Sequence, residues 1–236
     1  MAATDDTTGR MDDAAGDGAP ISTAETAGDN APDTVIGGTD NAQTAQAAGA
    51  EPIGQVESMA GTVVAVRADG TRVELKTGDS IYQGDTLETS ADGSVGVVLA
   101  DQTTFSMASN GQMVIDQMVY NPASNEGSIS MSVVEGVFTF VSGQIAKTDP
   151  DAMTLNTPVA TIGIRGTQVG IDVGEGKPMN VVLMEEADGF VGEVVVANNG
   201  GVQILNQAFQ STNVASSNAA PSQSFIYDTQ QLIQNF

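Results

Sequence analysis

The chain has 236 residues, with 30 Asp and Glu against 7 Lys and Arg, and it contains no Cys, His or Trp. Without Cys and His, the composition excludes disulfides, thiolate nucleophiles, His-based catalytic triads and the usual zinc and haem ligands. The net charge of −23 opposes binding to phosphate backbones and anionic membrane surfaces, because both depend on Lys and Arg. We therefore expect no nucleic acid among the partners, and no cofactor.

The sequence contains no segment that predicts membrane insertion or Sec-dependent export. No window approaches the roughly 20 consecutive apolar residues that span a bilayer, because Gly, Asp or Ser interrupts every Val-rich stretch. The acidic start lacks the apolar centre of a signal peptide. We therefore expect a chain that is not inserted into a membrane and that has no Sec signal.

Residues 1–50 are predicted to form a disordered acidic arm. The segment has nine acidic residues, no aromatic residue, and only Ile21, Val35 and Ile36 as branched apolar residues. It cannot bury enough apolar surface to offset the entropy lost on ordering. Its charge is compatible with weak calcium binding, although the sequence has neither an EF-hand loop nor a G-G-x-G-x-D repeat.

Residues 51–206 have the pattern of an all-β domain. Short apolar runs are interrupted about every eight to twelve residues by Gly, Asp, Asn or Ser. Residues 71–76 alternate strictly and place Val73 and Leu75 on one face, as a half-buried strand requires. Residues 112–120 fit either two helical turns or a strand.

Further strands are predicted from two other patterns. Ile129, Met131 and Val133 alternate with serines and indicate a second half-buried strand. Denser apolar runs predict strands that are buried on both faces. These runs are residues 95–99, 137–141, 180–184 and 194–197.

A loose repeat accompanies the predicted turns. Ala-Asp-Gly occurs at residues 68–70, returns 23 residues later at 91–93, and recurs at 187–189. Gly can adopt the positive φ of a tight turn, and Asp can accept hydrogen bonds from nearby backbone amides. Two architectures fit this pattern: a compact β-solenoid of stacked coils, and a curled double sheet built from hairpins.

Residues 207–236 are predicted to be a polar C-terminal extension. The segment is rich in Gln, Ser, Asn and Ala, and it finishes with several apolar residues that end at Phe236. It is too short to form a domain. A docking helix or strand, a secretion signal and an arbitrary stop in a longer chain all fit this pattern.

Three segments together resemble the FecR-like domain family. They are T-P-V-A-T-I-G-I-R-G-T at residues 157–167, G-D-S-I-Y-Q-G-D-T-L-E-T at 78–89 and V-E-G-V-F-T-F-V-S-G at 134–143. The resemblance covers about half of the chain, from Gly54 to Val173. It implies a β-rich, solenoid-like, noncatalytic domain that works outside the cytoplasm or at the bacterial surface.

Two sets of relatives give different expectations. In signalling members, the domain is the periplasmic half of a transmembrane anti-sigma regulator, but this sequence shows neither a helical anti-sigma domain nor a transmembrane segment. In the second set, a similar segment lies near the N-terminus of very large acidic, Cys-poor surface proteins that look like type I secretion substrates. The acidic arm and the absence of Cys make this chain resemble the second set more closely.

The T-P-V-A-T-I-G-I-R-G-T segment also has a physical interpretation. Pro158 suits the start or edge of a strand, and it biases Thr157 toward extended geometry. Gly163 and Gly166 suggest a tight bend or a close backbone approach. Arg165 is expected to hold a turn against an acidic neighbour, with contact to a partner as the alternative. The candidate site residues are Thr157, Pro158, Gly163, Arg165, Gly166 and Thr167.

These observations predict a noncatalytic module that acts by protein–protein interaction. No spacing selects a pair of carboxylates for glycoside chemistry, and no P-loop, G-x-S-x-G or Rossmann fingerprint is present. The expected setting is the cell surface or the medium, as part of an adhesin-type protein. The alternative is a periplasmic sensing or regulatory module of a signalling system.

Overall fold

The computed structural model describes residues 51–149 and 151–228, so the predicted acidic arm and the last eight residues lie outside the described part. Within that part, the chain forms seventeen strands and one short helix, α1 (Gln144–Thr148). The prediction of an all-β domain is confirmed. The described residues contain no helix that is both long and apolar enough to cross a membrane.

The strands form two sheets, A and B, and strand β9 (Glu126–Val141) belongs to both. In spatial order, sheet A contains β4 (Ser80–Tyr82), β1 (Pro52–Ala60), β6 (Ser94–Leu99), β7 (Thr104–Met107), β9, β12 (Gln168–Val173), β13 (Met179–Met184), β16 (Gln210–Val214) and β17 (Phe225–Ile226). Sheet B contains β3 (Arg72–Glu74), β2 (Val63–Val66), β5 (Thr86–Thr89), β8 (Gln112–Asn121), β9, β10 (Met153–Asn156), β11 (Thr161–Arg165), β14 (Glu193–Asn198) and β15 (Gly201–Leu205).

Strand β9 crosses from one sheet to the other at Gly136. Residues 126–135 pair with β8 in sheet B, whereas residues 136–141 pair with β12 in sheet A. Gly136 has a φ of +118°, a value that side chains other than hydrogen strongly disfavour. The crossing therefore depends on a glycine at this position.

One apolar core lies between the two sheets. Ile129, Met131 and Val133 are buried in the first half of β9, as their alternation predicts. In its second half, the Phe138 and Phe140 rings stack with their centroids 6.1 Å apart, and Phe140 also contacts a ring from β7. Alternate residues of each strand therefore supply the core, which is how two packed sheets bury their inner faces.

The denser apolar runs do not all behave as predicted. Among the strands of these four runs, β13 buries the consecutive residues Val181, Val182 and Leu183, whereas β6, the end of β9 and β14 alternate between buried and partly exposed positions. The prediction of burial on both faces is therefore wrong for those three strands, whose second face is only partly buried. Residues 112–120 form strand β8 and not a helix.

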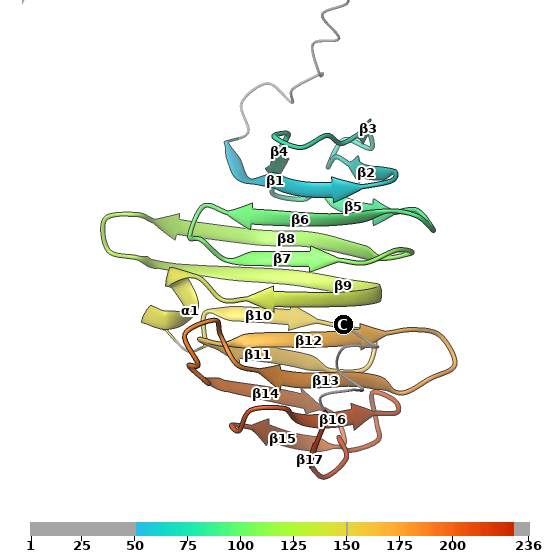
Figure 1. Ribbon diagram of the computed structural model, residues 1–236, viewed down its shortest axis with the longest axis vertical. Helices are drawn as coiled ribbons and strands as arrows, with labels where there is room; N and C mark the ends of the chain where they lie inside the picture. The colour runs from blue at the N-terminus through green and yellow to red at the C-terminus, as the bar shows by residue number, and fades with distance from the viewer. Residues whose placement is uncertain (1–50, 150, 229–236) are drawn as a thin grey trace, which may run out of the picture. The chain divides into compact units, whose positions relative to one another are not determined.

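The strand pairing distinguishes between the two predicted architectures. Both sheets add strands almost in chain order, and Figure 1 shows them following one another from β1 to β17. A solenoid of identical coils would pair its strands in parallel, but in the described part only β9 and β10 do so. The curled double sheet is therefore the architecture that describes this unit.

The predicted boundary at residue 206 is not a structural break. Strand β16 pairs with β13, and β17 pairs with β16, so part of the predicted polar extension completes sheet A. The Ser211 hydroxyl donates to the carbonyl of Val181 at 2.7 Å, and Thr212 donates to the carbonyl of Ser222 at 2.8 Å. The polar composition of β16 does not predict a buried strand. The strand can nevertheless be buried, because neighbouring backbone carbonyls accept hydrogen bonds from its hydroxyl groups.

The Asp-Gly turns form largely as expected. Asp69 accepts a hydrogen bond from the Thr71 amide at 2.8 Å, and Asp188 accepts one from the Phe190 amide at 2.9 Å. The glycines that follow these two aspartates have φ values of +84° and +83°. The loose sequence repeat therefore reflects repeated turn chemistry, which is local.

A buried ion pair joins the turns at the N-terminal end of the unit. Asp85 accepts hydrogen bonds from Arg67 and, at 2.8 Å, from the Tyr82 amide, while the Arg67 guanidinium lies 4.8 Å from the centre of the Tyr82 ring. Burial raises the pKa of Asp85, and the hydrogen bond from Tyr82 and the charge of Arg67 oppose this shift.

This raised pKa predicts a defined pH dependence of stability. Because the native state holds the Asp85 proton more tightly than the unfolded state does, the contribution of Asp85 is fully favourable below its ordinary pKa and is lost as the pH rises through the raised value. We expect the stability of the wild type, relative to Asp85→Asn, to fall as the pH increases through this window. Chemical denaturation of both proteins from about pH 3 to about pH 7 measures the difference, and parallel curves would contradict it.

Candidate protein-binding site

Five of the six candidate residues lie at the two ends of strand β11, and Gly163 lies within the strand. Thr157 and Pro158 form the turn between β10 and β11, where the Thr157 hydroxyl donates to the carbonyl of Ala160 at 2.8 Å and accepts from its amide at 3.0 Å. Pro158 is exposed in this turn and lies outside the strand. Arg165, Gly166 and Thr167 lie at the opposite end, so the structure does not bring the six residues together.

Gly163 does not have the predicted close backbone approach. It lies in the middle of β11, and a Cβ added there would meet the Val195 Cβ at 3.9 Å, an ordinary contact. Gly166, in contrast, has a φ of +63° where the chain passes from β11 in sheet B to β12 in sheet A. The bend therefore depends on Gly166 and not on Gly163.

Arg165 contacts two acidic side chains from different segments. Its Nη2 lies 2.7 Å from Asp151, and its Nη1 bonds the Glu193 carboxylate on the neighbouring strand β14. The side chain is partly exposed, so this pairing is screened by solvent. Arg165 therefore joins the end of β11 to two acidic side chains, and its alternative role, contact with a partner, stays a prediction.

Thr167 anchors the same end of β11 to the interior. Its amide donates to the Ser142 hydroxyl at 2.6 Å, and its own hydroxyl donates to the carbonyl of Met184 at 3.2 Å. Thr167 is fully buried, so these bonds are protected from water. They fix the crossover beside the end of β9 and the end of β13.

Helix α1 is held beside this crossover by the buried carboxylate of Asp101. Asp101 accepts hydrogen bonds from the Thr103 amide at 3.0 Å, from the Thr103 hydroxyl at 2.8 Å and from the Ile145 amide at 3.3 Å. Its backbone carbonyl also accepts from the Gln144 amide at 2.8 Å. Asp101 therefore satisfies amides at the start of α1 and determines where the helix lies.

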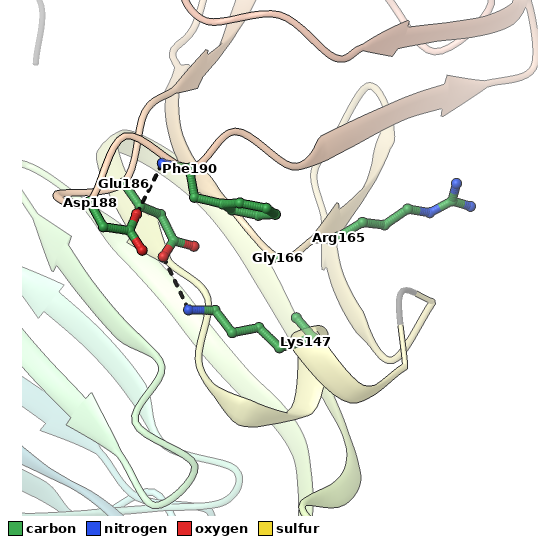
Figure 2. A pocket seen from close by; sticks show the side chains of 7 residues that line it. Lys147, Arg165, Gly166, Glu186, Asp188 and Phe190 are labelled. Atoms are coloured by element: carbon green, nitrogen blue, oxygen red, sulfur yellow. Dashed lines mark hydrogen bonds and ion pairs between the residues drawn. The ribbon is translucent and has the colours of Figure 1, made fainter.

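These elements surround a hollow with a volume of about 410 Å³. It lies between α1, the β11–β12 crossover and the loop that follows β13 (Figure 2). Its lining residues are Ala146, Lys147, Arg165, Gly166, Glu186, Asp188 and Phe190. We call it the α1 hollow.

Glu186 is the most unusual residue of the α1 hollow. One oxygen, Oε2, lies 3.1 Å from the Lys147 ammonium, and the Glu186 side chain is only 10% exposed. The other oxygen, Oε1, is buried and has no hydrogen-bond partner within the described part of the chain. An unsatisfied buried acceptor of this kind costs about 1–3 kcal/mol. Oε1 of Glu186 is therefore free to accept a hydrogen bond from a ligand.

Phe190 forms the apolar part of the α1 hollow. Its side chain is 52% exposed, and it follows a tight turn closed by the Glu186 and Gly189 amides. Figure 2 shows Lys147 and Glu186 directed toward each other, whereas Arg165 points away from both. A buried carboxylate, two paired cations and an exposed ring suit recognition of a polar group better than they suit acid–base chemistry.

Sequence reasoning found only part of this site. Arg165 and Gly166 were identified, but Lys147, Glu186 and Phe190 were not, because they come from segments that meet only in the folded chain. The Asp-Gly signal at residues 188–189 predicts the turn that presents Phe190. Nothing in the sequence distinguishes Glu186 from its exposed neighbour Glu185.

The described residues contain no group of three or more His, Cys, Asp or Glu side chains arranged to hold a metal ion. The predicted weak calcium binding belongs to the acidic arm, which lies outside the described residues. It stays a prediction. The same is true of the expectation that nucleic acid is not a partner.

The fold and the α1 hollow define a class of all-β domain that carries a hollow with charged and aromatic lining on its surface. Residues 85–187 match the family model described as FecR protein, so this part of the chain is a FecR domain. The match includes α1, the β11–β12 crossover and Glu186. The predicted family is confirmed.

Comparisons with curated proteins and with solved structures give fewer or weaker matches. No curated protein matches the chain. Two crystal structures of a protein provisionally described as an anti-sigma factor from Parabacteroides distasonis, at 1.65 and 2.50 Å resolution, are similar to it at 16% and 17% identity, with TM-scores of 0.46 and 0.48. In both cases 63% of this chain is covered, and the chain spans 62% of the other structure.

Proposed function

We propose that the chain is a noncatalytic sensing or regulatory module that works in the bacterial cell envelope by binding another protein. The FecR domain supports this proposal, because the family resemblance implies a domain that works outside the cytoplasm. The periplasm is the favoured location. The surface proposed to receive the partner is the α1 hollow.

The observation that carries the proposal is the position of the α1 hollow within the FecR domain. Five of its seven lining residues lie inside the matched range of 85–187. The unpartnered Glu186 oxygen and the exposed Phe190 ring give this surface both a polar and an apolar anchor, the combination by which a small contact area gains specificity. Nothing in this arrangement requires a reaction.

The adhesin-type, type I-secreted context is not favoured by the comparisons. It rests on the resemblance of residues 157–167 to a segment of large acidic surface proteins, on the net charge of −23 and on the absence of Cys. It stays a prediction of the sequence, as does location at the outer surface.

Photocrosslinking in the native bacterium tests the proposed function. The crosslinker benzoylphenylalanine replaces Phe190, and a matched chain carries it at Val119, which has a similar exposure on strand β8. We expect the chain in the periplasmic fraction, and a discrete protein adduct from position 190 that position 119 does not give. A cytosolic chain, or the same adducts from both positions, would contradict the proposal.

A regulatory role has its own readout. Deleting the coding sequence is expected to change the transcript levels of a small set of genes when wild-type and deletion strains are compared by RNA sequencing. Restoring the wild-type chain is expected to reverse the change. Unchanged transcript levels under both rich and nutrient-limited growth would contradict the regulatory part of the proposal.

A further inference from the structure

The buried oxygen of Glu186 limits what the α1 hollow can bind. Oε1 is shielded from water and has no partner within the described residues, while Oε2 is engaged by Lys147. A carboxylate oxygen accepts hydrogen bonds and cannot donate them when ionised. The missing group is therefore an N–H or O–H donor, and a charged donor would form the stronger bond.

The charges around the α1 hollow also favour a cation. Lys147 is paired with Glu186, and Arg165 is paired with Asp151 and Glu193. Neither is an unpaired positive charge that an anionic ligand could use. Asp188 and Glu185 add exposed negative charge on the same loop, and the whole chain carries −23. A cationic group is therefore attracted to this surface and an anionic one is repelled.

Phe190 supplies the second contact that a basic side chain needs. Lys and Arg carry an apolar stem and a charged end, and aromatic faces attract both. Phe190 is half-exposed at the edge of the α1 hollow, on the loop that also carries Glu186. A stem lying along the ring would direct its charged end toward the buried carboxylate.

We propose that the α1 hollow receives a Lys or Arg side chain of a partner protein, whose charged end donates to Oε1 of Glu186 while its stem packs on Phe190. The inference rests on the proposed function and deepens it by naming the chemistry of the partner. Lys147 and Phe190 line the α1 hollow beside Glu186, and both are partly exposed. Exposed side chains change rotamer within picoseconds to nanoseconds, so both can move to admit a ligand.

The test uses the isotope-labelled full chain and two small probes. N-acetyl-lysine methylamide carries the ammonium, and N-acetyl-norleucine methylamide has the same stem without the charge. We expect the lysine probe to shift the NMR signals of Lys147, Glu186 and Phe190 in a saturable way, and the norleucine probe not to do so. Equal shifts with both probes would overturn the proposal.

Matched variants separate specific binding from general attraction to an acidic chain. Glu186→Gln is expected to raise the Kd for the lysine probe about tenfold, as loss of a charge-assisted hydrogen bond predicts. Glu185→Gln makes the same charge change at an exposed neighbouring position and is expected to leave the Kd within about twofold. Equal effects of the two changes would reduce the binding to general electrostatics and overturn the proposal.

A third variant keeps the test valid if Glu186→Gln disturbs folding. Phe190→Ala removes an exposed ring and is expected to raise the Kd about threefold, because exposed cation–π contacts are weak. An unchanged Kd would remove the ring from the proposed site. Crosslinks at position 190 together with no binding of the lysine probe would end this inference while leaving the proposed function intact. Probe binding without crosslinks or transcript changes would contradict the proposed function, while the binding of a basic side chain by the α1 hollow would stand.

Discussion

Replacing Gly136 by Ala is expected to lower the free energy of unfolding by about 3 kcal/mol. Two costs combine at this position. The backbone φ of +118° is strained for any residue with a Cβ, and an added Cβ would lie 2.7 Å from the Gly111 Cα. Since Gly111 also lacks a side chain, the approach is between backbones, and neither can move without disturbing the sheets.

Gly163→Ala is the matched control for this prediction. It makes the same chemical change within strand β11, where an added Cβ meets only an ordinary contact. It is expected to leave stability unchanged or to raise it by about 0.5 kcal/mol, because Ala loses less backbone entropy on folding than Gly. Urea denaturation followed by far-ultraviolet circular dichroism measures both variants. Similar losses from the two would show that the crossing at Gly136 is not strained.

Replacing Asp101 by Ala is expected to cost about 3 kcal/mol, since it leaves buried donors of Thr103 and Ile145 without their acceptor. The effect reaches beyond stability, because the same carboxylate holds the start of α1. We expect Lys147, which lies on α1, to lose its fixed position in the α1 hollow. Native-state hydrogen exchange of the α1 amides, compared with that of the β13 amides, measures this local loosening.

Asp101→Asn provides the control for the Asp101 prediction. The side-chain amide retains one oxygen acceptor, so it is expected to lose less stability than the alanine variant while keeping the shape of the site. Faster exchange at α1 in Asp101→Ala, with β13 unchanged, is the predicted pattern. If exchange rose equally in both elements, Asp101 would support the whole unit and not the helix in particular.

Several features of the fold were predictable because they arise locally. The alternation of Ile129, Met131 and Val133 indicates a half-buried strand whatever its partners are, since side chains of a strand point alternately to its two faces. Asp-Gly at residues 188–189 predicts a turn for the same kind of reason. The FecR resemblance was also recognisable from three short segments in order.

Other features were not predictable because they depend on contacts between distant segments. Burial of both faces was expected for four strands but occurs in one of these four, β13, since the outer cover of a strand comes from elsewhere in the chain. The polar composition after residue 206 hid strand β16, whose Ser211 and Thr212 hydroxyls are satisfied only once β13 and the Ser222 turn are in place.

Composition and local patterns are enough to identify an acidic chain whose residues 51–206 are all-β and include a FecR segment with Arg165 and Gly166. These conclusions follow from charge, from a period of two residues and from turn chemistry, all of which act over a few neighbouring residues. In contrast, the folded chain was needed to reveal that β9 belongs to both sheets and that Lys147, Glu186 and Phe190 share one hollow. Strand pairing and burial are set by residues far apart in the chain, so local patterns do not reveal them. For this reason, Glu186 and Glu185 are equivalent in sequence, and only in the folded chain is one carboxylate buried and the other exposed.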